Sequence, residues 1–210
     1  NPDIDTAAYA VAWHRDVGGE LLPLKVAAVE FVNVVRPTVA TAVYIVFVAH
    51  ALTVHPDSRP LVTTSPETLD AFVQEVRRFY PFFPTLAARA RRSFEWNGHA
   101  FPEGRQVMLD LYGTNHEETE WGDPDVFRPE RFLDHDERRY AFIPQGGGDH
   151  FRQHRCPGEW IVIALMGAAA RLLTDETVFD TPEQDLSIDY GRLPALPRSG
   201  FLMRNVRTIG

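Results

Sequence analysis

Residues 142–158, FIPQGGGDHFRQHRCPG, decide the fold of this chain, because they place its only cysteine, Cys156, just before an apolar run. That run, residues 159–173, predicts a helix, and the unpaired N–H groups at a helix start favour negative charge. Such a site favours the thiolate form of a cysteine, which is the form that binds metals. Pro157 suits the first helical turn, and the glycines let the backbone bend closely around something flat and bulky. A lone cysteine is otherwise most often a small buried apolar residue, so the rest of the chain must decide between the two interpretations.

The composition is that of a globular protein. The 210 residues are 44% hydrophobic and 11% aromatic, which is enough to bury the core of one or two domains. A single cysteine excludes an internal disulfide, so a reducing compartment, the cytoplasm, fits better than secretion. The net charge of −8 argues against general nucleic-acid binding, although Arg89, Arg91 and Arg92 form a local basic cluster. We therefore expect a cytoplasmic protein that does not bind nucleic acid.

No segment of the sequence predicts a membrane span. The apolar stretch at residues 39–52 is too short to cross a bilayer comfortably, and Thr41, Tyr44 and His50 interrupt it. The first residues lack the basic and apolar regions of a secretory signal. Because they also lack an initiator methionine, we expect upstream sequence to be missing.

The periodicity predicts a mainly α-helical chain with small β-sheets. Residues 25–52 predict a long apolar helix that Pro37 interrupts and kinks. Ser65 as N-cap and Pro66 at the first helical position predict a second helix that ends near Tyr80.

Strands and irregular segments are expected between the helices and at the C-terminal end. Residues 94–112 are strand-like, with a hairpin turn at Asn97-Gly98 and a β-rich run at residues 107–112. Residues 113–148 predict a long irregular stretch with a short helix near Asp125, and loops of this length are uncommon unless functional. Residues 182–210 predict short strands and turns.

Three motifs, in this order and spacing, resemble the C-terminal half of a cytochrome P450. They are Glu75-x-x-Arg78 on a helix, Phe127-Arg-Pro-Glu-Arg-Phe132 in an irregular stretch, and Phe142 with His154-Arg-Cys156-Pro-Gly158 before a helix. The resemblance implies the P450 fold, with residues 1–210 forming the C-terminal portion of a single domain. The N-terminal half of the same protein would then be a required partner.

The resemblance also implies roles for individual residues. Cys156 becomes the axial thiolate ligand of a haem b iron, and the electron donation of that ligand favours O–O bond cleavage. Glu75, Arg78 and Arg131 become a structural network that secures the region around the ligand.

The haem loop departs from the general P450 pattern. Phe142 lies 14 residues before Cys156 in place of the usual seven, and His154 stands where P450s carry an arginine that supports a haem propionate. We therefore expect His154 or Arg155 to contact the cofactor, with a loop-stabilising role for the histidine as an equal alternative.

The long apolar helix departs from the pattern as well. Oxygen-activating P450s carry an acid followed by a threonine here, whereas this chain has Arg36 and Pro37. An arginine cannot deliver protons at neutral pH, but it can bind a carboxylate through two parallel hydrogen bonds. The alternative for Arg36 is a side chain that extends to solvent at a kink. Asn33, on the same helical face, is a candidate contact in the distal pocket.

Together the two departures resemble the bacterial fatty-acid peroxygenase (CYP152-like) branch, from about Leu21 to the C-terminus. The resemblance implies that Arg36 holds the carboxylate of a long-chain fatty acid, and that this carboxylate is the acid/base group for hydrogen peroxide, the co-substrate. Hydroxylation at the α or β carbon then follows from positioning, without an obligatory redox partner. Pro37 would shape the kink beside the peroxide site, and Phe82 and Phe83 would line the acyl-chain site. The alternative for these two aromatic residues, which prolines flank, is an ordinary place in the core.

Three alternatives remain open. The first is a P450 monooxygenase that depends on a redox partner. The second is a zinc site built from His150, His154 and Cys156, since imidazole and thiolate are zinc ligands. The third is a haem-binding or fatty-acid-binding module without enzymatic activity.

Overall fold

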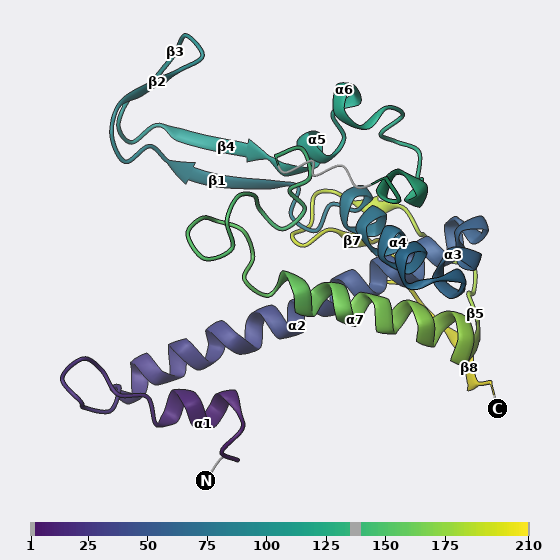
Figure 1. Cartoon of the computed structure of the whole chain (residues 1–210), viewed down its shortest axis with the longest axis horizontal. Helices are drawn as coiled ribbons and strands as arrows, with labels where there is room; N and C mark the ends of the chain where they lie inside the picture. Colours follow the sequence, from purple (N-terminus) through teal and green to yellow (C-terminus); the bar gives the residue numbers. More distant parts are fainter. Residues whose placement is uncertain (1–2, 135–139, 210) are drawn as a thin grey trace. The chain divides into compact units, whose positions relative to one another are not determined.

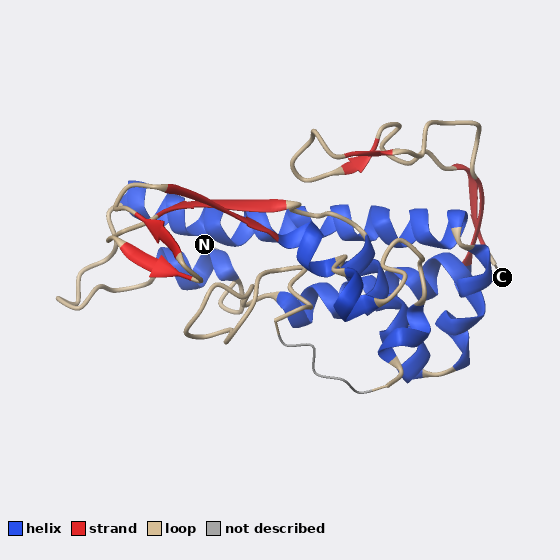
Figure 2. Ribbon diagram, turned by 90° about the horizontal axis from the view of Figure 1, so that it is seen from above, coloured by secondary structure: helices blue, strands red, loops and turns tan. Residues whose placement is uncertain are grey.

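The computed structural model describes residues 3–134 and 140–209. The chain divides into two compact units, Asn1–Ala42 and Val43–Gly210. Helices, blue in Figure 2, dominate both units. The strands in the described ranges pair into four two-stranded antiparallel sheets. The predicted class, mainly α with small β-sheets, is confirmed.

The first unit contains helix α1 (Ala7–Ala12) and the beginning of helix α2 (Leu24–Val54). The Thr6 side chain caps α1 by accepting a hydrogen bond from the Tyr9 amide, and the sequence analysis missed this helix. Helix α2 runs through Pro37 without the predicted interruption. The Thr38 and Thr41 hydroxyls donate to the carbonyl groups one turn earlier, at 2.9 and 3.2 Å.

The length of α2 changes the expectation about the membrane. The helix predicted over residues 25–52 is confirmed within two residues at each end. Its 31 residues are long and apolar enough to cross a membrane by length and composition alone, which the apolar stretch at residues 39–52 did not indicate. However, 44% of its most apolar part is buried inside the protein. Within the second unit, α2 contributes several core side chains, among them Tyr44, Phe47, Val48 and Leu52. These residues have protein partners for their apolar surface.

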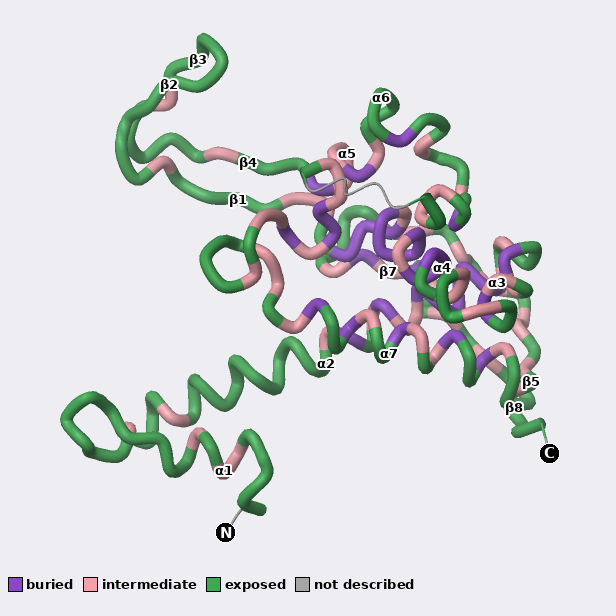
Figure 3. The backbone as a smooth tube through the Cα atoms, viewed as in Figure 1, coloured by how far each residue is buried: buried purple, intermediate pink, exposed green. Residues whose placement is uncertain are grey.

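The C-terminal half of helix α4 (Pro66–Phe79) lies in the core of the second unit, where residues 71–73 and 75–78 are buried. Figure 3 colours buried residues purple. The helix begins as predicted: Ser65 accepts from the Thr68 amide, and the Thr68 hydroxyl accepts from the Ser65 amide. It packs mainly against helix α3 (Arg59–Thr64), the 3-10 helix η2 (Pro129–Phe132) and helix α7 (Glu159–Arg171). Helix α3 follows the short η1 (Pro56–Ser58). The residues that α4 places in the core include charged ones.

Two antiparallel hairpin pairs follow α4 and are visible in Figure 1. Strand β1 (Thr85–Arg89) pairs with β4 (Gln106–Asp110), and β2 (Phe94–Trp96) pairs with β3 (His99–Phe101). The predicted turn at Asn97-Gly98 is confirmed, and both residues have positive φ angles, 51° and 77°. Strand β1 was missed. The predicted strand at residues 107–112 ends early, because the Asp110 side chain caps a helix that begins at the next residue.

The stretch predicted as irregular carries short helices in other places than expected. They are α5 (Leu111–Asn115), α6 (Glu118–Trp121) and η2. The helix expected near Asp125 is absent from the structure, and Asp125 lies in a turn. Residues 135–139 of this stretch lie outside the described residues.

The C-terminal region agrees with the sequence. Helix α7 begins at Glu159 as predicted and is followed by a π-helical turn, η3 (Leu172–Glu176). Strand β5 (Thr177–Asp180) then pairs with β8 (Arg204–Thr208), and β6 (Ile188–Asp189) pairs with β7 (Leu196–Pro197). The predicted short strands and turns over residues 182–210 are confirmed.

Candidate functional site

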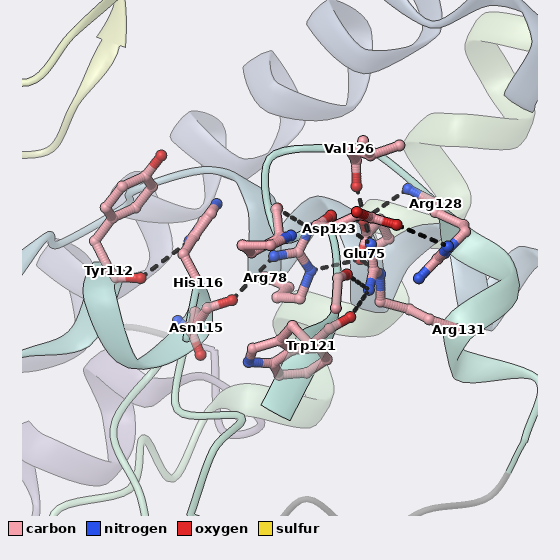
Figure 4. A network of polar contacts seen from close by, with 12 residues as sticks. Glu75, Arg78, Tyr112, Asn115, His116, Trp121, Asp123, Val126, Arg128 and Arg131 are labelled. Carbon is pink, nitrogen blue, oxygen red and sulfur yellow. Dashed lines mark hydrogen bonds and ion pairs between the residues drawn. The ribbon is translucent and has the colours of Figure 1, made fainter. Parts of the chain in front are cut away.

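The predicted network of Glu75, Arg78 and Arg131 is present and buried (Figure 4). Arg78 donates to both Glu75 carboxylate oxygens, at 2.7 and 2.8 Å, and the Arg131 Nε lies 3.2 Å from Oε2. The Arg128 amide donates to the same carboxylate at 2.8 Å. The Glu75 and Arg78 side chains have no exposed surface, so this pair is not the surface ion pair that an isolated E-x-x-R spacing usually forms.

The network connects α4 to the chain segments around it. Arg78 also donates to the carbonyl oxygens of Asn115 and Pro124, both at 2.9 Å. The Asn115 side chain in turn accepts from the Ile143 amide at 2.8 Å. Several hydrogen bonds of this kind offset part of the desolvation of a buried guanidinium group. As a result, the ion network is tied to the beginning of the 142–158 segment.

The 142–158 segment folds back on itself, so that its two ends meet. The Cys156 amide donates to the Gln145 carbonyl at 3.0 Å. Gly146 allows this return, because its φ angle is +86° and a Cβ atom there would lie 2.1 Å from the His154 carbonyl oxygen. Cys156 has a free thiol, is partly exposed, and stands three residues before α7, whose N-cap is Gly158.

A second buried ion cluster, which the sequence analysis missed, lies at the start of α7. The Glu159 carboxylate accepts from Arg77, from His150 Nε2 at 2.7 Å, and from Arg155 Nε at 2.6 Å. Burial acts to raise the pKa of Glu159, but the hydrogen bond from Arg155 and the charge of Arg77 outweigh it and lower the pKa to about 2. The i,i+4 spacing of Arg155 and Glu159 was the available signal for one of these contacts.

The candidate cofactor contacts before Cys156 differ in their surroundings. The Arg155 guanidinium is bound by Glu159, while the His154 side chain is exposed and makes no hydrogen bond within the described ranges. His150 bonds Glu159 and stacks on Trp160, with ring centroids 4.1 Å apart.

The structure gives no support to the zinc alternative. In residues 3–134 and 140–209, no group of three or more His, Cys, Asp or Glu side chains is arranged to hold a metal ion. His150, His154 and Cys156 are therefore not brought together as a ligand set.

The candidate substrate residues lie in both units. Arg36, Pro37 and Asn33 belong to the first unit, where the Arg36 side chain is exposed. Phe82 and Phe83 belong to the second. Phe82 is only 9% exposed and stacks on the core residue Tyr44 at 4.5 Å, whereas Phe83 is 40% exposed.

The residues around Cys156 fit a haem group. A free, partly exposed thiol on a constrained loop is the donor that a haem–thiolate centre requires. A Cβ atom at Gly158 would lie 3.9 Å from the Cys156 sulfur, in ordinary van der Waals contact, and the glycine leaves this contact unmade. Cys156 would hold the iron of such a group.

The comparison with known families decides the assignment. The cytochrome P450 family model matches residues 66–184. The chain belongs to the cytochrome P450 family. The P450 fold predicted from the three motifs is confirmed.

Solved P450 structures match nearly the whole chain. Cytochrome P450SP alpha (CYP152B1), in complex with (R)-ibuprofen, is 63% identical with a TM-score of 0.89, and the match covers 96% of this chain and 50% of that one. Cytochrome P450EX alpha (CYP152N1), with myristic acid, is 48% identical with a TM-score of 0.90, covering 99% and 51%. A variant of cytochrome P450 OleT, in complex with arachidonic acid, is 38% identical with a TM-score of 0.90, covering 100% and 50%. The predicted resemblance to the CYP152 branch is confirmed.

Curated P450 relatives are more distant. Cytochrome P450 3A17 from Cavia porcellus is 31% identical over 131 residues, which are 60% of this chain and 25% of the relative. Sugiol synthase from Salvia miltiorrhiza is 37% identical over 139 residues, which are 64% and 26%. The chain therefore spans about half the length of the solved structures, and its matches cover about a quarter of these curated relatives.

Proposed function

We propose that the protein containing this chain is a haem–thiolate peroxygenase that uses hydrogen peroxide to hydroxylate long-chain fatty acids at the α or β carbon. The similar P450EX alpha and OleT structures contain myristic and arachidonic acid, which supports a fatty acid as substrate. The haem, held by Cys156, supplies the oxygen-transfer chemistry, and the protein supplies positioning and proton transfer.

The observation that carries the proposal is the environment of Arg36. It is a cation in the apolar helix α2, and its side chain makes no hydrogen bond or ion pair within the described residues. Glu30, the only acidic residue of α2, instead lies 3.4 Å from the Asn33 amide nitrogen, which donates to it. A guanidinium without an acidic partner is suited to bind a carboxylate through two parallel hydrogen bonds. A fatty acid held in this way would bring the acid/base group that α2 lacks around Arg36.

The neighbouring residues take supporting roles in the proposal. Pro37 has no N–H group, so the Asn33 carbonyl lacks its usual helical donor, which makes the backbone beside Arg36 unlike an ordinary helix turn. Phe83 presents more free surface for an acyl chain than Phe82, whose ring is packed on Tyr44.

The activity would belong to the full-length protein. Helix α7 exposes Ile161 and Leu165, and Leu172 at the start of η3 continues this exposed apolar stripe. Exposed apolar stripes of this kind are normally covered. Because the chain spans about half of the similar structures, we assign the covering surface to the remaining part of the same protein. A single free thiol suits the reducing cytoplasm as its compartment.

The test is the Arg36→Ala variant of the full-length protein, supplied with hydrogen peroxide and a long-chain fatty acid. Loss of two charge-assisted hydrogen bonds should reduce turnover at least about a hundredfold while haem content is unchanged. The matched control is Arg91→Ala, which removes an exposed arginine from the connection between β1 and β2. Mass spectrometry of the products would identify the hydroxylated carbon.

Each alternative gives a different result. Unchanged turnover in Arg36→Ala would contradict the carboxylate anchor. Turnover that requires NAD(P)H and a reductase would support a redox-partner-dependent monooxygenase. A haem-loaded wild type that is inactive with peroxide and with reductase would indicate a binding module. A reduced, CO-bound wild type without the thiolate–haem absorption signature would exclude Cys156 as ligand.

A further inference from the structure

The ion cluster at Glu159 closes the base of the enlarged haem loop. Arg77 reaches the loop from α4 and contacts it at both ends. At the beginning its Nε donates to the Gln145 side chain at 3.1 Å, and its guanidinium lies 5.2 Å from the centre of the Phe142 ring. At the end it forms an ion pair with Glu159, the first residue of α7.

This arrangement forms a closed set of contacts around Cys156. The Cys156 amide bonds the Gln145 carbonyl, the Gln145 side chain bonds Arg77, and Arg77 bonds Glu159. The Glu159 amide then returns to the Cys156 carbonyl at 3.3 Å. The backbone that carries the thiol is thus held from Gln145, Arg77 and Glu159.

The extra residues of the loop are attached to the same carboxylate. His150 belongs to the enlarged part, and Arg155 immediately precedes the cysteine, yet both donate to Glu159. The Glu159 and Arg77 side chains are 4% and 1% exposed, so solvent does not screen this pair as it screens a surface pair. One buried carboxylate thus gathers donors from α4, from the enlarged loop and from the residue before Cys156.

We propose that Arg77 and Glu159 are positioning residues for the haem thiolate: their ion pair fixes the Cys156 backbone against α4 and compensates for the length of the loop. This inference rests on the proposed role of Cys156 as the haem ligand. The Glu75 network ties α4 to the connection after β4 and, through Asn115, to the Ile143 amide, whereas the Arg77–Glu159 pair holds the part of the segment next to Cys156.

The test compares Glu159→Gln with Glu176→Gln in the full-length, haem-loaded protein. Glutamine keeps the shape of Glu159 but removes the charge and one acceptor oxygen. Glu176 is an exposed residue after the same helix, and its side chain has no hydrogen bond or ion pair in the part of the chain that the structure describes.

The primary measurement is amide hydrogen exchange followed by mass spectrometry. Glu159→Gln should raise exchange in residues 145–156 about tenfold and leave the β1–β4 hairpin unchanged, because only the local opening becomes easier. It should also increase the fraction of reduced, CO-bound protein that lacks the thiolate signature. If Glu159→Gln does not fold, Arg77→Lys is the second variant. It keeps the positive charge but loses the hydrogen bond to the Gln145 side chain, and it should also raise the exchange of residues 145–156.

The outcomes separate this inference from the proposed function. The positioning role would be overturned if Glu159→Gln had the same exchange and the same thiolate signature as the wild type. It would also be overturned if the variant raised exchange equally in all segments. A wild type without the thiolate signature would instead overturn the role of Cys156, and the exchange of residues 145–156 would still report whether the ion pair fixes the loop.

Discussion

Replacing Glu75 with alanine should cost more stability than any surface charge change in this protein. The fully buried carboxylate accepts from Arg78 and from the Arg128 amide and forms an ion pair with Arg131. Its loss would leave two guanidinium groups, 0% and 3% exposed, without their counter-charge.

The magnitude follows from the burial. Breaking a buried ion pair by removing one partner costs about 3–5 kcal/mol, because the remaining charge stays buried. This is a large share of the roughly 5–15 kcal/mol by which a folded domain is stable. Glu75→Gln keeps the volume and one acceptor oxygen, so its loss should be smaller but still above about 1 kcal/mol.

The assay is urea unfolding of the full-length protein, followed by circular dichroism and haem absorbance, with free energies extrapolated to water. The matched control is Asp123→Asn, which removes the Arg128 pair at 3.8 Å, where the side chains are 45% and 74% exposed. The free energy of unfolding of Asp123→Asn should lie within about 0.5 kcal/mol of the wild-type value. Equal unfolding free energies for Glu75→Ala and Asp123→Asn would refute the importance assigned to the buried network.

Three further predictions concern the loop, the pH dependence and a helix start. Gly146→Ala should lower the free energy of unfolding by at least about 1–3 kcal/mol, because φ is +86° and the new Cβ would meet the His154 carbonyl; an unchanged urea midpoint would contradict this. Burial, and after it the charge of Arg78, lowers the pKa of His116 from 6.5 to about 4. His116 therefore contributes stability that is fully present above pH 6.5 and is lost as the pH falls towards 4, because the unfolded chain takes up the proton first. His116→Gln should therefore flatten the dependence of unfolding free energy on pH in that range, and an equal slope in both proteins would show that other groups cause it. Ser65→Ala should cost about 1 kcal/mol in the same urea assay through loss of the α4 cap, and no loss would mean that another group replaces it.

Local rules predicted the elements whose signals lie within a few residues. The Ser65-Pro66 start of α4, the Asn97-Gly98 turn and the Glu159 start of α7 all occur where the sequence placed them. Steric and capping preferences act over one helical turn or less, so neighbouring residues in the sequence are sufficient to determine these helix starts and this turn. Strand β1 was missed because its register depends on β4, a partner about twenty residues away.

Motif spacing was sufficient to predict the P450 family, the fold and the Glu75 network. It also predicted that Cys156 lies just ahead of the helix α7, three residues before its start, and the resemblance to the CYP152 branch followed from the enlarged loop and Arg36-Pro37. These inferences needed only residue identity and distance along the chain.

What only the tertiary structure decided is which charges are buried together. Arg77 and Glu159 are 82 residues apart, and no pattern in the sequence predicts that they form a pair. Their pairing depends on α4 packing against α7 and on a loop that returns to Gln145. The sequence determined that a cysteine stands before an apolar helix, whereas packing decided what fixes it there, because burial and charge pairing between distant segments arise only when the chain has folded.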